Sequence, residues 1–185
     1  MKIKSISIYL IIFILLLRFE SNAQVDTTLK AREKNTIFFE GAGNSVLYSL
    51  NYDRLIKTSN IFMTSARIGV HYSNDFNNNN RKIIAIPFEL SKLYLFHKTG
   101  NFIEFGSGIT YINENIVSLN HTVNVLVVAL RIGYRLQKPK GGFFFKVGLT
   151  PLYDFYAWNR LPKVNYNTLY LSFGLGIGYT FKSNK

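Results

Sequence analysis

The 185-residue chain contains no cysteine, which excludes a disulfide framework and any thiolate metal site. Proline is scarce, with four residues, and acidic residues are outnumbered by basic ones, 10 against 22. Beyond residue 17 no apolar run approaches the roughly 18 residues that mark a membrane-spanning helix. Charges interrupt even the most apolar later stretch, 123–136. Any stabilising framework must therefore come from packing and hydrogen bonding.

The first 23 residues have the composition of a secretory signal peptide. Lys2 and Lys4 precede an apolar run at 6–17, and small residues lead to a cleavage site expected after Ala23. The run is shorter than the roughly 20 residues that a spanning helix needs. We therefore expect residues 1–23 to be removed on export and to be followed by a polar periplasmic tail at 24–34. The alternative is an uncleaved membrane anchor.

The mature chain would remain basic. Removing Lys2, Lys4, Arg18 and Glu20 leaves 19 basic and 9 acidic residues, a net charge of +10. Such a charge is compatible with nucleic acid or with anionic lipid and glycan as partners. Export disfavours nucleic acid, and the basic residues are scattered rather than clustered. The charge therefore leaves anionic envelope surfaces as compatible partners without naming a ligand.

Most of the chain alternates between bulky apolar and small or polar side chains. In the last such stretch, LSFGLGIGYTF at 171–181, leucine, isoleucine and aromatic residues alternate with serine, glycine and threonine. Successive side chains of a strand point to opposite faces, so each stretch predicts a strand with two unlike faces. Helical periodicity is hard to find, which favours an all-β fold. Pro87 lies inside one such stretch, and because it cannot donate to a ladder we expect a β-bulge there.

Turn-forming residues divide the mature chain into eight predicted strands. These are 35–43, 46–55, 60–72, 82–94, 101–113, 121–137, 142–153 and 167–181. Their connections alternate between longer polar ones, at 73–81, 113–120 and 154–166, and shorter ones, apart from a short first connection at 43–45. Outer-membrane barrels have long loops outside and short turns inside, with both termini on the periplasmic side. The sequence thus predicts a transmembrane up-and-down antiparallel barrel at 35–181, with a C-terminal tail at 182–185.

The face opposite the apolar one carries four acidic and four basic side chains. They are Glu40, Asp53, Arg67, Glu89, Glu104, Arg131, Arg135 and Lys146. In the apolar ligand cavity of a soluble carrier these charges would have a large desolvation cost. In the polar lumen of a membrane barrel we expect them to form a packed ion-pair ladder, with a gated path for protons or small ions as the alternative. Side chains fill an eight-stranded barrel, so no open pore is expected.

Aromatic residues in phase with the apolar face fall near both ends of the predicted strands. The outer ends carry Tyr72, Tyr111 and Tyr153, and the periplasmic ends carry Tyr52, Tyr94, Tyr134, Phe143, Tyr179 and Phe181. Amphipathic rings are enriched at membrane–water interfaces, so these residues predict two girdles around the barrel. Their phase indicates that the apolar face meets lipid.

On these residues, the chain resembles the small eight-stranded outer-membrane β-barrels of Gram-negative bacteria, of the outer membrane protein beta-barrel domain type, over 35–181. The most specific match is the last strand, where Gly176, Tyr179 and Phe181 correspond to the terminal insertion signal of that family, although Lys-Ser-Asn-Lys follows. The resemblance implies recognition by the barrel assembly machinery. We predict a monomer in the cell outer membrane that contacts its lipids and possesses a structural or surface-interaction role, without cofactor or enzymatic activity.

Residues capable of chemistry occur near the predicted outer ends of the strands. They are His71, Ser73, Asp75, His121 and Asp154. A Ser/His/Asp set can build an activated nucleophile, so the first alternative function is a lipid A- or phospholipid-modifying enzyme at the outer rim. No spacing forces these residues together, and none is assigned a catalytic role. The second alternative is a soluble, lipocalin-like periplasmic carrier, whose outer face would be polar.

Metal, nucleotide and glycan binding have thinner support. His71 and His121 lack an evident carboxylate companion, so no metal site is assigned. The glycine runs lack the G-x-G-x-x-G order and a following helix, which excludes a nucleotide loop. His97 is expected to be solvated in a periplasmic turn. The best candidates for binding lipopolysaccharide phosphates lie in the last predicted outer loop: Trp158, Arg160 and Lys163.

Overall fold

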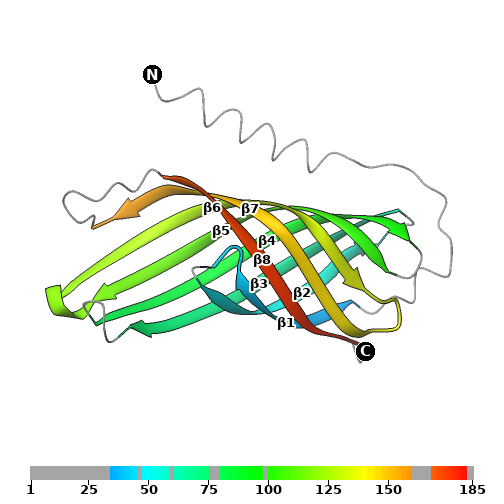
Figure 1. Cartoon of the computed structure of the whole chain (residues 1–185), viewed down its shortest axis with the longest axis horizontal. Coiled ribbons are helices and arrows are strands. Elements are labelled where there is room, and N and C mark those ends of the chain that lie inside the picture. The colour runs from blue at the N-terminus through cyan, green and yellow to red at the C-terminus, as the bar shows by residue number, and fades with distance from the viewer. Residues whose placement is uncertain are drawn as a thin grey trace, which may run out of the picture.

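Eight β-strands follow one another round a closed ring, each antiparallel to its neighbours, with the first paired to the last (Figure 1). The computed structural model describes residues 34–45, 47–58, 61–75, 80–97, 100–159 and 168–182. The strands are β1 (Asn35–Ala42), β2 (Tyr48–Thr58), β3 (Phe62–Asp75), β4 (Arg81–His97), β5 (Asn101–Ile116), β6 (His121–Gln137), β7 (Gly142–Trp158) and β8 (Leu169–Phe181). The predicted all-β, up-and-down barrel is confirmed. The predicted signal peptide and most of both tails lie outside the described residues.

The two ends of the barrel carry different elements. At the terminal end, β1 begins and β8 finishes side by side, with Asn35 paired to Phe181. The opposite end, the rim end, carries the β1–β2, β3–β4, β5–β6 and β7–β8 connections. Strands β4 to β7 have 16 or 17 residues each, whereas β1 has eight. The wall is therefore uneven, and Figure 1 shows the β1–β2 hairpin ending well short of the tips of β4–β7.

Three rim-end connections are shorter than predicted because paired strands continue into them. The polar residues that suggested loops bond across the sheet instead: Arg81 forms an ion pair with Glu114, and the Asn113 side chain donates to Asn124. A single 3₁₀ turn, η2 (Val117–Leu119), joins β5 to β6. Among the described residues, no helix is long and apolar enough to cross a membrane. The pairing extends to Asp75–Arg81 and Ile116–His121, and β7 continues to Trp158.

The outer surface of the barrel is apolar on every strand. On β8, Leu171, Phe173, Leu175, Ile177 and Tyr179 are 43–67% exposed, while the alternating glycines face the lumen. One comparable outward residue from each strand, all 41–54% exposed, is Phe39, Leu50, Ile68, Phe88, Phe105, Ile132, Leu149 and Ile177. This arrangement is the reverse of a soluble protein, which buries such side chains.

Two glycines of β8 are required by close approach to their neighbours. A Cβ atom on Gly178 would lie 2.1 Å from the backbone oxygen of Ile37 and 2.4 Å from the Cβ of Phe38. On Gly176 it would lie 2.8 Å from the Cγ of Lys146. The bare inner face of β8 therefore leaves room for the bulky inward side chains of β1 and β7 in a narrow lumen.

Pro87 is accommodated without the predicted bulge. The β3–β4 register is the same on both sides of it, at Ile68–Phe88 and at His71–Ala85, and no shift intervenes. Gly69 lies opposite, and a Cβ there would approach the Cγ of Pro87 to 3.0 Å. The prediction of a bulge was wrong because a cross-strand glycine makes room for the ring while the ladder simply skips two pairs.

Candidate functional site

The eight charged lumen residues come together as two connected layers. In the layer nearer the rim end, Arg67 and Arg131 lie between Glu40 and Glu89. Arg67 contacts Glu40 at 2.5 Å and Glu89 at 3.5 Å, and Arg131 contacts the same two carboxylates at 2.8 Å and 3.1 Å. Each carboxylate is thus shared by two guanidinium groups. This four-membered ring joins β1, β3, β4 and β6 across the interior.

The second layer lies nearer the terminal end. Arg135 binds Asp53 through both Nη atoms, at 2.5 Å and 3.1 Å, and lies 3.7 Å from Glu104. Lys146 contacts Glu104 at 3.1 Å and Glu89 at 3.5 Å, which links the two layers. The four acids balance the four bases, and no member is more than 3% exposed. Mutual pairing is what makes such deep burial of charge tolerable.

Polar and aromatic side chains complete the contacts of the network. Asn51 accepts a hydrogen bond from Arg67 Nε at 2.9 Å, and Gln137 accepts one from Arg135 Nε at 3.1 Å. The guanidinium of Arg67 lies over the ring of Phe38, and that of Arg135 over Phe144. None of these four residues was predicted from the sequence to belong to the network. Their inward parity was the only signal that could have found them.

The β1–β2 turn folds inward over the rim side of the network. The Asn44 side chain donates to Glu89 at 2.5 Å and accepts from Arg131 at 3.2 Å, and its backbone oxygen accepts from Thr110 at 2.8 Å. Gly43 has φ +70°, the left-handed conformation that glycine favours. A turn predicted as a plain connection is therefore part of the packed interior.

An apolar layer lies on the terminal side of the network. Leu55, Met63, Leu93 and Phe102 pack together there, and each is at most 1% exposed. These side chains come from β2, β3, β4 and β5. Along the axis, the interior thus changes from an inward-folded turn to a charged double layer and then to a hydrocarbon layer.

The predicted girdle residues lie in rows across neighbouring strands. At the terminal end, Tyr52, Tyr179 and Phe143 lie on β2, β8 and β7, linked through Ile37 of β1. A second row is formed by Tyr94 and Tyr134 on either side of Ile103. Towards the rim end lie Tyr72, Tyr111 and Tyr153. At the terminal end of β8, Phe181 pairs with Asn35 of β1. Phe181 is two residues beyond Tyr179 and five beyond Gly176, whose position faces the lumen.

One histidine–serine pair forms on the inner face of β3 near the rim end. His71 Nε2 lies 3.0 Å from Ser73 Oγ, and its Nδ1 lies 2.6 Å from the backbone oxygen of Tyr48. A carbonyl can only accept, so in the neutral ring Nδ1 carries the proton and Nε2 accepts from the serine hydroxyl. This is the arrangement of a nucleophile and its base, with a backbone carbonyl rather than a carboxylate orienting the ring.

The other chemical candidates lie apart from that pair. His121 Nε2 contacts the backbone oxygen of Asn159 at 2.7 Å, and Asp154 accepts from the Tyr170 hydroxyl at 3.1 Å. Within the described part of the chain, no three His, Asp or Glu side chains are placed to hold a metal ion. Trp158 ends β7 and packs edge-on against Tyr156. The side chains of Asp75 and His97, and residues Arg160 and Lys163, lie outside the described set.

Comparison of the chain with models of known protein families, with curated proteins and with solved structures gives no match. The class of protein is therefore defined by the fold alone: a closed, eight-stranded antiparallel barrel with a charged interior and an apolar exterior. That architecture is compatible with a small outer-membrane barrel.

Proposed function

We propose that the chain is an integral, monomeric outer-membrane β-barrel with a structural or surface-interaction role and a closed polar lumen. Residues 1–23 direct its export, and Gly176, Tyr179 and Phe181 present β8 to the barrel assembly machinery. Outer-membrane lipids surround the apolar band. Lipopolysaccharide contacts the rim end, where the exposed ring of Trp158 lies.

The observation that carries this proposal is the reversed polarity of the wall. Every strand contributes large apolar side chains to the outside, while eight paired charges occupy the inside. Lipid satisfies the first condition, and a closed ladder satisfies the backbone without water. A soluble carrier needs a polar exterior, and the described strands instead present large apolar side chains on the outside.

The closed lumen supports a structural role over conduction. The charged double layer and the apolar layer of Leu55, Met63, Leu93 and Phe102 both fill the cross-section of a barrel that is narrow by its strand number. An ion crossing it would have to displace paired charges and then dehydrate against hydrocarbon. The ion pairs instead tie opposite walls together, which stiffens the barrel.

The test is membrane fractionation followed by gel electrophoresis with and without boiling. Membrane barrels commonly resist SDS until heated, because each ladder hydrogen bond closes within the ring. We expect the protein in the outer-membrane fraction with a mobility that changes on boiling. A soluble protein whose mobility does not change would overturn the proposal.

The His71–Ser73 pair favours a second candidate function, acyl-ester hydrolysis at the rim end. Ser73 Oγ would attack an ester carbonyl while its proton passes to His71 Nε2 and then to the leaving alcohol. Water would release the acyl group as a carboxylic acid and regenerate the serine. The pair lies on the part of β3 that extends beyond its last partner on β2, at the rim end. Since the rim end is proposed to lie at the outer leaflet, the substrate class is a lipid A or phospholipid ester.

Mass spectrometry of membrane lipids tests this second function. Cells that express the protein should lose one ester-linked acyl chain from a lipid, and Ser73→Ala and His71→Gln should both abolish the change. Ser107→Ala, on the outer side of β5, should leave it intact. An identical lipid profile with the unmodified protein and with Ser73→Ala would exclude hydrolysis by this pair.

A further inference from the structure

The barrel wall has a gap at the rim end because the β1–β2 hairpin ends early. The last pair between β1 and β8 is Ala42–Gly174, and the last between β2 and β3 is Leu50–Val70. Beyond these pairs, and within the described part of the chain, residues 169–173 of β8 are paired only with β7. Residues 71–75 of β3 are likewise paired only with β4. Two strand edges therefore face each other across the short hairpin.

The hairpin covers part of this gap. Its turn lies inward, held by Asn44 against Glu89 and Arg131. On the β3 side, the Tyr48 hydroxyl donates to the backbone oxygen of Tyr72, which satisfies one carbonyl of the open edge. The described contacts place no such side-chain cap on the β8 edge. The part of the gap that no described side-chain contact covers therefore lies between the β1–β2 turn and the edge of β8.

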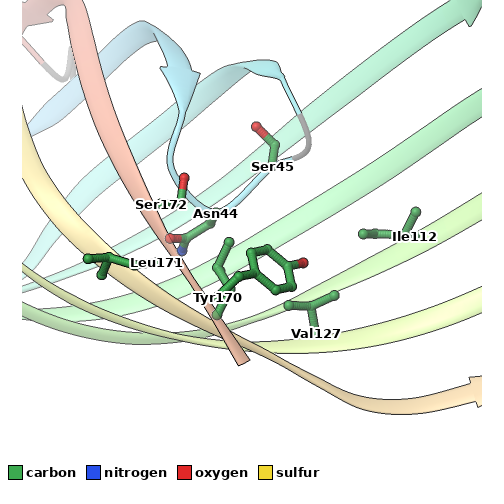
Figure 2. Close-up of a pocket in the computed structure, with 8 residues that line it drawn as sticks. Asn44, Ser45, Ile112, Val127, Tyr170, Leu171 and Ser172 are labelled. Atoms are coloured by element: carbon green, nitrogen blue, oxygen red, sulfur yellow. The ribbon is translucent and has the colours of Figure 1, made fainter. Parts of the chain in front are cut away.

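A cavity of about 240 Å³ lies at that position. Asn44 and Ser45 of the turn line one side, and Leu171 and Ser172 of the β8 edge line another. Figure 2 shows Tyr170 directed towards Val127, whereas the Leu171 side chain points away from it on the other side of β8. The floor is apolar and is formed by three side chains on the inner face of the tall wall: Ile112 of β5, Val127 of β6 and Leu152 of β7.

The floor and the volume both suit hydrocarbon. Val127 and Leu152 belong to a buried apolar cluster on β6 and β7, against which Ile112 packs. An apolar cavity of about 150 Å³ is enough to hold benzene, so this larger space can accept a stretch of alkyl chain. The polar groups are confined to the turn and β8 sides. A hydrocarbon chain would thus meet an apolar floor over its length.

The depth of the gap points to the membrane as the source of that chain. Leu169 pairs with Tyr153 of the rim-end girdle, and Phe173 pairs with Leu149, which is in the apolar band. Both β8 residues, and Leu171 between them, are 56–67% exposed on the outer face. The edge spans about 13 Å of strand at roughly 3.3 Å per residue. It therefore begins at the girdle and descends into the apolar band.

We propose that this cavity binds one acyl chain of an outer-leaflet lipid, which enters sideways between β8 and the β1–β2 turn. The proposal rests on the outer-membrane location proposed above. It does not depend on the His71–Ser73 pair being catalytic. The chain lies on Ile112, Val127 and Leu152, while its headgroup stays at the level of Tyr153.

Photochemical labelling tests the site. The purified protein is inserted into phosphatidylethanolamine vesicles that contain a small share of the same lipid with a diazirine on one acyl chain. After irradiation, labelled residues are identified by mass spectrometry. We expect adducts on the inward-facing Val127 and Leu152 in addition to adducts on outward-facing residues such as Ile132 and Leu149.

Two variants separate occupancy from general insertion. Val127→Phe fills the cavity and should remove the adduct on Leu152 while the outward adducts persist. Val128→Phe, on the outer face of the same strand, should leave the inward adducts unchanged. The unmodified protein already decides the matter if Val127→Phe does not fold.

The remaining outcomes have distinct meanings. Outward adducts without inward ones overturn the acyl-chain site and leave the membrane location standing. Absence of adducts on the outer face contradicts the membrane location itself. Inward adducts produced only by a short, water-soluble diazirine carboxylic acid added to unlabelled vesicles would assign the cavity to an aqueous ligand and also overturn the proposal.

Discussion

Asp53 on β2 and Arg135 on β6 are joined across the lumen by two hydrogen bonds, although three strands separate them in either direction round the ring. The distances are 2.5 Å and 3.1 Å, and both side chains are almost fully buried. Ser65 and Gln137 accept further hydrogen bonds from the same guanidinium. The pair is thus a strut that connects opposite walls of the barrel.

Breaking this strut from one side should destabilise the barrel strongly. Asp53→Asn preserves the shape of the side chain but leaves the Arg135 charge short of a partner in a dry interior. We expect the free energy of unfolding to fall by about 3–5 kcal/mol, measured by urea titration of the protein in detergent micelles. Glu114→Gln removes the partner of the half-exposed Arg81 and should cost about 0–1 kcal/mol. Equal losses in the two variants would show that the lumen pair has no special weight.

The set of paired charges could be predicted from the sequence, whereas the pairing itself could not. Alternation alone put Glu40, Asp53 and Arg135 on one face, because a strand has a strict two-residue period. Which carboxylate meets which guanidinium depends on the tilt and stagger of the strands around the ring. The sequence of one strand determines neither the tilt nor the stagger. Arg135 therefore pairs most closely with Asp53 across the lumen rather than with a carboxylate on an adjacent strand.

The inward turn and the extended strands were beyond the sequence for a different reason. Asn44 sits among glycine and serine, a composition that also fits a solvated turn, so nothing local revealed that it completes the network. Glu114 and Asn113 likewise looked like loop residues, although cross-strand partners make them suitable strand residues. A polar composition therefore predicts a loop wrongly where the polar side chains of a strand find partners on neighbouring strands.

The Asn44 contact gives a second prediction. Asn44→Ala removes a donor to Glu89 and an acceptor from Arg131, so both charged groups lose a partner. We expect a loss of about 1–3 kcal/mol in the free energy of unfolding. Ser45→Ala removes only a long 3.4 Å contact to Ala42 and should be nearly silent. A silent Asn44→Ala in the same titration would mean that the turn does not anchor the network.

The last strand gives a third prediction, about space. Gly178→Ala would drive a methyl group into the Ile37 oxygen, and the backbone of β1 or β8 must move. We expect a loss of about 1–3 kcal/mol and a lower temperature for the mobility change on gels. Gly41→Ala is the matched control, because the nearest atom to its added Cβ is 4.0 Å away. If both variants behave like the unmodified protein, the glycine face of β8 is not set by packing.

The terminal signal gives a fourth prediction, about assembly. Tyr179→Ala should reduce the amount of protein in the outer membrane several-fold, because recognition of the last strand by the assembly machinery is proposed to need that ring. Ile177→Ala is the matched control, since Ile177 also faces outward on β8 and has similar exposure. Quantitative blotting of outer-membrane fractions measures the effect. Equal reductions would assign it to lost apolar surface rather than to a signal.

The most direct test of the membrane-barrel proposal is its topology, and the absence of cysteine makes that measurement clean. Ser118→Cys places a thiol in the exposed η2 turn at the rim end, and Lys140→Cys places one in the exposed β6–β7 turn at the terminal end. Both variants are treated, in intact Gram-negative cells, with a maleimide that does not cross membranes. The proposal predicts labelling of Ser118→Cys in intact cells and of Lys140→Cys only after the outer membrane is permeabilised. Equal labelling of the two positions, or protection of both until lysis, would contradict it.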